Sequence, residues 1–76
     1  MKKIELKSLE DLARTVREAR KEQGLNQEDL AGLANTGRRF IVDLEAAKET
    51  LQIGKTLQVL SALGLSLNIE RFWGED

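Results

Sequence analysis

Apolar residues recur at helical spacing along most of this chain, and the first such segment follows Ser8. One face of that segment collects, at steps of three and four residues, Leu9, Leu12, Ala13, Val16, Ala19 and Gln23. Ser8 is a favourable N-cap and Asp11, three residues later, completes a capping-box pattern. Gly24 suits the left-handed residue that follows a helix. The pattern predicts a long first helix between Ser8 and Gly24.

Two shorter helices are predicted between Leu25 and Lys48. The first is capped by Asn26 with Asp29 three residues on, and it ends at Asn35, which tolerates a left-handed backbone. Its apolar face is made of Leu30, Ala31 and Ala34. Thr36 and Gly37 form a turn that offers an N-cap to the second of these two helices. In that next helix Ile41 and Leu44 are the inward pair, and the opposite side carries Arg38, Arg39, Val42 and Asp43.

The third helix has no glycine to end it, because Ala47 stands at that place and lacks the freedom of glycine at positive φ. We therefore expect this helix to run slightly past Glu45. Thr50 is the expected cap of a fourth helix over about residues 52–63, terminated by Gly64. Its expected inner stripe is Ile53, Leu57, Leu60 and Leu63.

The hydrophobic period changes to two at both ends of the chain. Leu65, Leu67 and Ile69 alternate with polar residues, which predicts a strand over residues 65–71. Residues 1–7 alternate more weakly through Ile4 and Leu6, so that either a short strand or a frayed terminus fits them.

Length and composition narrow the class of protein. A chain of 76 residues makes one small domain, which is marginal on its own and favours oligomerisation. The absence of cysteine and histidine excludes disulfides, thiolate metal sites and imidazole chemistry, and no cofactor is indicated. Without a signal-peptide core or a membrane-length apolar run, we expect a cytoplasmic protein. The net charge of −1 argues against nucleic-acid binding unless the cations are gathered on one face.

Arg38 and Arg39 are the candidate functional residues of this chain. A helix–turn–helix whose second helix begins with arginines has the geometry that enters the DNA major groove. Arginine can donate two hydrogen bonds to guanine O6 and N7, so we expect at least one of the pair to contact a base while the other positions the helix. Val42 can meet a thymine methyl group. Asp43 either accepts from cytosine N4 or orients an arginine.

Residues around these side chains complete the predicted DNA-binding surface. Gln27 lies at the start of the second helix, where free backbone N–H groups favour a phosphate. Asn26 can assist it, and Gly37 allows the backbone to approach the DNA closely. Thr36, in the same turn, and Lys48, beyond the third helix, are the remaining members.

Several of these residues carry a family resemblance. Leu25, Gln27, Leu30-Ala31, the Arg38-Arg39-Phe40-Ile41 start, Leu44-Glu45 and Lys48 resemble the Cro/C1-type, or XRE, helix–turn–helix family. The later stretches KTLQVL (residues 55–60) and ALGL (residues 62–65) are similar to its HipB-type antitoxin branch. The resemblance covers about residues 9–70.

The resemblance implies a mainly α, compact, four-helix lambda-repressor-like domain over residues 8–64. It implies a structural salt bridge between Arg20 and Glu45. It also implies that the strand over residues 65–71 pairs across a homodimer, ahead of a tail at residues 72–76. The expected dimer interface is Leu65, Leu67, Ile69, Phe72 and Trp73, although Trp73 could instead anchor another protein.

The leading hypothesis is therefore a dimeric, sequence-specific repressor that binds an inverted-repeat operator. By resemblance, it is the antitoxin of a HipA-type kinase toxin and regulates its own operon. A stand-alone XRE repressor and, less favoured, a protein-interaction adaptor that does not bind DNA are the alternatives. An enzyme is not expected, because Asp43 and Glu45 point to different sides of a helix and no nucleophile has a base nearby.

Overall fold

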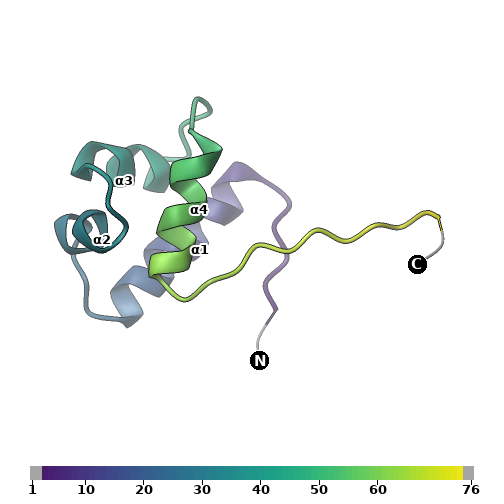
Figure 1. Cartoon of the computed structure of the whole chain (residues 1–76), viewed down its shortest axis with the longest axis horizontal. Coiled ribbons are helices and arrows are strands. Elements are labelled where there is room, and N and C mark those ends of the chain that lie inside the picture. The colour runs from purple at the N-terminus through teal and green to yellow at the C-terminus, as the bar shows by residue number, and fades with distance from the viewer. Residues whose placement is uncertain (1–2, 75–76) are drawn as a thin grey trace.

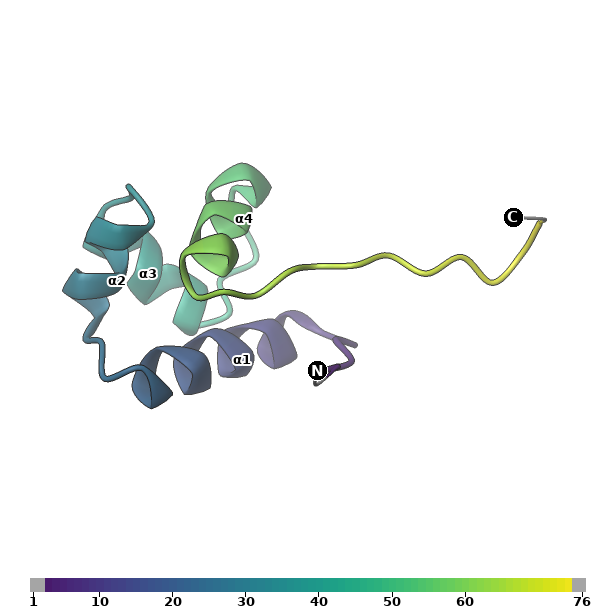
Figure 2. The same cartoon turned by 60° about the horizontal axis from the view of Figure 1, so that its bottom comes forward.

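Four α-helices pack around one core in the computed structural model, which describes residues 3–74. They are α1 (Leu9–Glu22), α2 (Gln27–Leu33), α3 (Arg38–Glu45) and α4 (Ile53–Ala62). Helices α2 and α3 stand side by side at one end and α4 lies next to them, while α1 runs behind the other three in Figure 1 and beneath them in Figure 2. None of the helices in this part of the chain has the length and apolar character needed to cross a membrane.

Small and branched aliphatic side chains fill the core. Its buried members are Val16, Leu30, Ala31, Ala34, Ile41, Leu44, Val59, Leu60 and Leu63. They come from all four helices, so no helix can leave the bundle without exposing part of this cluster to water. The predicted inward residues of α1, α2 and α3 are thereby confirmed in the main. Gln23, predicted to face the core, is exposed, but its Nε2 donates to the Leu63 carbonyl at 2.9 Å.

The helix caps explain where α1 and α2 begin. Ser8 Oγ accepts from the Asp11 N–H at 3.1 Å, but the Asp11 carboxylate accepts the N–H of Lys7 at 2.9 Å and not that of Ser8. The bond from Lys7, followed by the contact with Arg14, lowers the pKa of Asp11. The α2 capping box is complete, with Asn26 Oδ1 accepting from the Asp29 N–H at 2.7 Å and Asp29 Oδ2 from the Asn26 N–H at 3.0 Å.

All four helices end in the same way, with a left-handed residue after the C-cap. These residues are Gly24, Asn35, Ala47 and Gly64, with φ values of 70°, 56°, 56° and 76°. After α4, for example, the N–H of Gly64 donates to the Ser61 carbonyl and that of Leu65 to the Leu60 carbonyl, which is the Schellman pattern. The expectation that Ala47 would let α3 run on is wrong. The helix ends at Glu45 because Ala47 accepts the left-handed conformation.

Helix α4 corrects two sequence predictions. Its N-cap is Gln52, without a side-chain cap, and not Thr50. Ile53 and Leu57, predicted to face inward, are 65% and 46% exposed, whereas Thr56 and Val59 are buried in their place. Thr56 can lie in the core because its hydroxyl donates to the Gln52 carbonyl at 2.9 Å, which satisfies the polar group. Leu60 and Leu63 are buried as predicted.

The two ends of the described chain contain no strand. Residues 3–7 are irregular and mostly exposed, so a strand there is not confirmed, and residues 1–2 lie outside the described part. Residues 66–74, which we call the C-terminal arm, leave the helices in an extended course and point away from them in both views (Figures 1 and 2). Within this one chain, residues 65–71 do not form a strand. Leu65 itself packs, partly buried, against the core, and its predicted place in a dimer interface stays a prediction.

Candidate nucleic-acid interface

The start of α3 presents two adjacent cations to solvent. Arg38 and Arg39 are the first two residues of the helix, and both are exposed. Gly37 is the N-cap and provides no side-chain hydrogen bond, so the first-turn N–H groups of α3 lack a side-chain cap. Ile41 and Leu44, on the opposite side, are fully buried and fix the helix to the core. The sequence prediction of an outward arginine pair on a rigid helix is therefore confirmed.

A buried ion pair joins α1 to the end of α3. Arg20 Nε donates to Glu45 Oε2 at 2.7 Å and Arg20 Nη2 to Glu45 Oε1 at 3.0 Å, while Nη1 donates to the Leu25 carbonyl at 2.9 Å. The two side chains are only 11% and 6% exposed. The hydrogen bond with Glu45 raises the pKa of Arg20, and burial opposes this shift. The expected structural salt bridge is present, with the two-pronged geometry that suits a guanidinium and a carboxylate.

Gln27 extends this contact toward the surface. Its Nε2 donates to Glu45 Oε1 at 3.3 Å, and its Oε1 accepts from Arg38 Nη2 at 3.4 Å. A continuous series of side-chain contacts thus leads from Arg20 through Glu45 and Gln27 to Arg38. The sequence placed Gln27 at the start of α2, but no spacing rule linked it to Glu45 or Arg38. Only the packing of α2 against α3 brings these side chains together.

Asp43 lies between the other two cations of the predicted surface. Its Oδ1 is 3.3 Å from Arg39 Nε, one helical turn earlier, and its Oδ2 is 3.7 Å from Lys48 Nζ, beyond the helix end. Lys48 reaches this position because its N–H bonds the Asp43 carbonyl at 3.1 Å in the turn made by Ala47. The structure therefore groups Arg39, Asp43 and Lys48, as it groups Arg38 and Gln27.

The remaining predicted residues occupy the same region in different environments. Asn26 is exposed, but its side-chain oxygen is used in the α2 capping box. Val42 is half-buried on α3. Thr36 Oγ1 is buried and has no hydrogen-bond partner among the described residues, and Gly37 is exposed with open space where a Cβ would lie. None of these observations requires a base or phosphate contact, so their DNA contacts stay predictions.

The charges of α3 oppose the dipole of the helix. Its first turn has no acidic residue and contains both arginines, and its last turn has no basic residue and contains Asp43 and Glu45. Backbone dipoles make a helix N-terminus partly positive, which disfavours cations there unless an anion is present. A bound polyanion would remove this conflict. Among the described residues, no group of three or more acidic side chains could hold a metal ion.

Two short helices crossing at a tight turn, with the second carrying exposed arginines at its start, define a helix–turn–helix protein. The family model described as Helix-turn-helix matches residues 16–69, and the chain belongs to this family. The Uncharacterized HTH-type transcriptional regulator y4mF of Sinorhizobium fredii (strain NBRC 101917 / NGR234) is 58% identical over 64 residues, which make up 84% of each protein.

Solved structures share the fold. A chain of the structure described as "HipB-O4 20mer complex" matches with a TM-score of 0.82 over 93% of this chain and all of its own length, at 20% identity. A chain of the "Structure of HipA-HipB-O2-O3 complex" matches equally well. A "Toxin-Antitoxin module from Streptococcus pneumoniae" matches with a TM-score of 0.70 at 27% identity, over 82% of this chain and 68% of that one. These likenesses support the four-helix architecture of the XRE type.

Proposed function

We propose that this protein is a sequence-specific, DNA-binding transcriptional repressor in which α3 enters the major groove. The observation that carries the proposal is the start of α3, where two exposed arginines share an N-terminus that has no acidic neighbour in its first turn. Phosphate oxygens would meet the free N–H groups and the cations together. The match to the Helix-turn-helix family supports the same function.

The nearly neutral net charge of the chain does not prevent this binding. Arg38, Arg39 and Lys48 lie at the two ends of α3, while the carboxylate of Glu45 is buried against Arg20. The acid among these cations, Asp43, contacts two of them. In this proposal Gln27, Gly37 and Lys48 contact the DNA backbone, with Asn26 and the turn residue Thr36 beside them, and Val42 meets a base edge.

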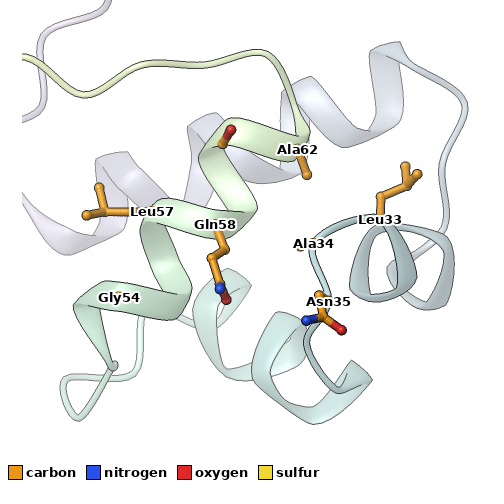
Figure 3. A pocket seen from close by; sticks show the side chains of 8 residues that line it. Leu33, Ala34, Asn35, Gly54, Leu57, Gln58 and Ala62 are labelled. Atoms are coloured by element: carbon orange, nitrogen blue, oxygen red, sulfur yellow. The ribbon is translucent and has the colours of Figure 1, made fainter.

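Homodimerisation forms the second part of the proposal. Apolar side chains stay exposed on the C-terminal arm and on α4, and they are Leu67, Ile69, Phe72, Trp73, Ile53 and Leu57. Leu57 also borders a shallow groove between α4 and the end of α2, where Leu33 is 63% exposed (Figure 3). A second copy of the chain would cover such surfaces, with residues 65–71 of the two copies paired as strands. Two recognition helices would then bind an inverted-repeat operator.

An antitoxin paired with a HipA-type kinase toxin is the finer assignment that we favour. The likeness to chains from the HipA-HipB complex and from a toxin–antitoxin module supports it at the level of the fold. A stand-alone repressor of the same family is the alternative. Co-expression with the product of an adjacent kinase-like gene separates the two, since co-purification supports the antitoxin and its absence favours the lone repressor.

The double variant Arg38→Ala, Arg39→Ala tests DNA recognition. Binding to the DNA upstream of the gene is measured by fluorescence anisotropy across a salt series. Wild-type affinity should fall steeply with salt, because cations displace counterions from phosphates. The variant should lose its preference for this DNA over a random duplex, since each bidentate arginine–guanine contact supplies about 1–3 kcal/mol of discrimination.

The matched control is Lys3→Ala, Lys7→Ala, which removes the same charge from the N-terminal segment, away from α2 and α3 (Figure 1). It should keep the preference for the operator. Equal discrimination by the wild type and the arginine variant would contradict the proposed site.

A further inference from the structure

Arg39, Asp43 and Lys48 form a compact group on the outer side of α3, which we call the Asp43 clamp. The carboxylate uses one oxygen for each cation, at 3.3 Å from Arg39 Nε and 3.7 Å from Lys48 Nζ. The Asp43 side chain is 25% exposed, whereas that of Arg39 is 82% exposed and that of Lys48 is 52% exposed. The anion is therefore held close to the helix while both cations extend into solvent.

Helix stability does not account for the clamp. Exposed pairs one turn apart contribute little to folding, and the order found here, cation before acid, is the weaker of the two orders. Both charges also lie at the ends of α3 where the helix dipole disfavours them. An arrangement that does not help the free protein fold is better explained by what it does to a ligand.

The two adjacent arginines are held by different atoms. Arg38 is held at a terminal nitrogen, because its Nη2 donates to Gln27 Oε1. Arg39 instead forms an ion pair with Asp43 through Nε, at 3.3 Å. A contact at Nε leaves both Nη groups for other partners, and these are the donors that match guanine O6 and N7. The ion pair thus keeps the Arg39 guanidinium beside Asp43 with its bidentate donors available, while Arg38 leans toward the start of α2.

We propose that Asp43 is a positioning residue that makes Arg39 the base-contacting arginine, with a guanine as its target and Arg38 on the phosphate backbone. The same carboxylate competes with phosphates for Arg39 and Lys48, and its own charge repels the phosphates of any duplex. A guanine contact made by Arg39 offsets this repulsion, and DNA without a guanine at that position does not. Asp43 therefore raises discrimination more than affinity. This inference rests on the proposed function and chooses between the two roles that the sequence left open for Asp43.

The experiment compares Asp43→Asn with Glu49→Gln, which removes the same charge from an exposed residue of the next loop. Each variant is titrated with the operator, with operators altered at single G·C pairs, and with a random duplex, over a salt series. Asp43→Asn should bind the random duplex more tightly and should lower the ratio of operator to random affinity by about tenfold. Its salt dependence on the random duplex should steepen by roughly one phosphate contact. Glu49→Gln should keep the wild-type ratio.

A double-mutant cycle with Arg39→Ala shows whether Asp43 acts through Arg39. Arg39→Ala should become insensitive to one G·C pair per half-site, and Asp43→Asn should then lower discrimination no further. Arg38→Ala should instead weaken binding to all duplexes alike. Thermal unfolding of each variant confirms that the fold is intact.

Three results would overturn the inference. One is an unchanged affinity ratio in Asp43→Asn. Another is full additivity of Asp43→Asn and Arg39→Ala, which would mean that Asp43 contacts a base by itself. The third is a G·C sensitivity that disappears in Arg38→Ala and persists in Arg39→Ala. If the wild-type protein shows no preference for the operator at all, the proposed function fails, and this inference fails with it.

Discussion

Helices α1 and α3 touch each other through Arg20 and Glu45, yet their charges follow opposite patterns. Helix α1 has Glu10 and Asp11 in its first turn and basic residues in its last turn, which agrees with the helix dipole. Helix α3 begins with two arginines and ends with acids. The charges of α1 stabilise the helix itself, whereas the charges of α3 suit a negatively charged ligand.

The residues at the ends of α1 also stabilise the helix better than those at the ends of α3. The N-cap of α1 is Ser8, whose hydroxyl caps the first turn, and the helix is followed by Gly24 at φ 70°. The N-cap of α3 is Gly37, which provides no side-chain cap, and the helix is followed by Ala47 at φ 56°. A left-handed alanine is strained where glycine is not. Helix α3 therefore depends on the buried Ile41 and Leu44, and on α1, to hold its shape.

The largest expected effect comes from cutting the link between the two helices. Arg20→Ala leaves the Glu45 carboxylate buried with Gln27 as its remaining side-chain partner. Because removing half of a buried pair typically costs about 3–5 kcal/mol, the free energy of unfolding in a urea titration should fall by that amount.

Arg14→Ala is the control, since its pair with Asp11 is exposed and should contribute little to the free energy of unfolding. A similar small loss in Arg20→Ala would show that α3 does not need α1 to hold it in place.

An intermediate effect is expected at the helix ends. Ala47→Gly relieves the left-handed strain after α3 and should raise the free energy of unfolding by about 1 kcal/mol. The mirror change Gly24→Ala, after α1, should lower it by a similar amount. Urea titrations of both variants measure this contrast. Loss of stability in both would mean that Ala47 is not strained.

The smallest effect on stability, with a larger one on binding, is expected at Gly37. Gly37→Asp adds the missing cap and an acid at the helix N-terminus, which should stabilise the protein by a few tenths of a kcal/mol. The new carboxylate should also repel phosphate and weaken DNA binding. Gly37→Ser supplies a cap without a charge and should keep the binding. Anisotropy titrations and thermal unfolding of the two variants distinguish the effects, and unimpaired binding by Gly37→Asp would place the phosphates elsewhere.

The ends of helices were predictable from the sequence where the residue type strongly favours a cap or a left-handed backbone. The capping box of Asn26 and Asp29, and the left-handed residues Gly24, Asn35 and Gly64, were all predicted from the sequence and are confirmed. Predictions failed where a residue was suited, or unsuited, to a helix end but the chain was free to do otherwise. Thr50 was a reasonable cap that α4 does not use, and Ala47 was thought unable to end α3.

The candidate site was predictable in its members and not in their connections. The family resemblance supplied the pair of Arg20 and Glu45, and the sequence placed Arg38 and Arg39 outward. The contact of Gln27 with both Glu45 and Arg38 joins side chains from different helices, and sequence spacing within one helix carries no information about it. The single chain shows no strand over residues 65–71, so the predicted pairing between copies stays a prediction.

The sequence by itself determined where α1 and α2 of this protein start and stop, which residues of α1 to α3 face inward, and which cations lie outside. These properties depend on period, caps and side-chain chemistry, all of which act over a few residues. Only the tertiary structure decided that Thr56 and not Leu57 fills the core, and that Asp43 holds both Arg39 and Lys48. Packing selects one face among several apolar ones, and the turn at Ala47 brings a distant charge within reach, so neither result follows from local pattern alone.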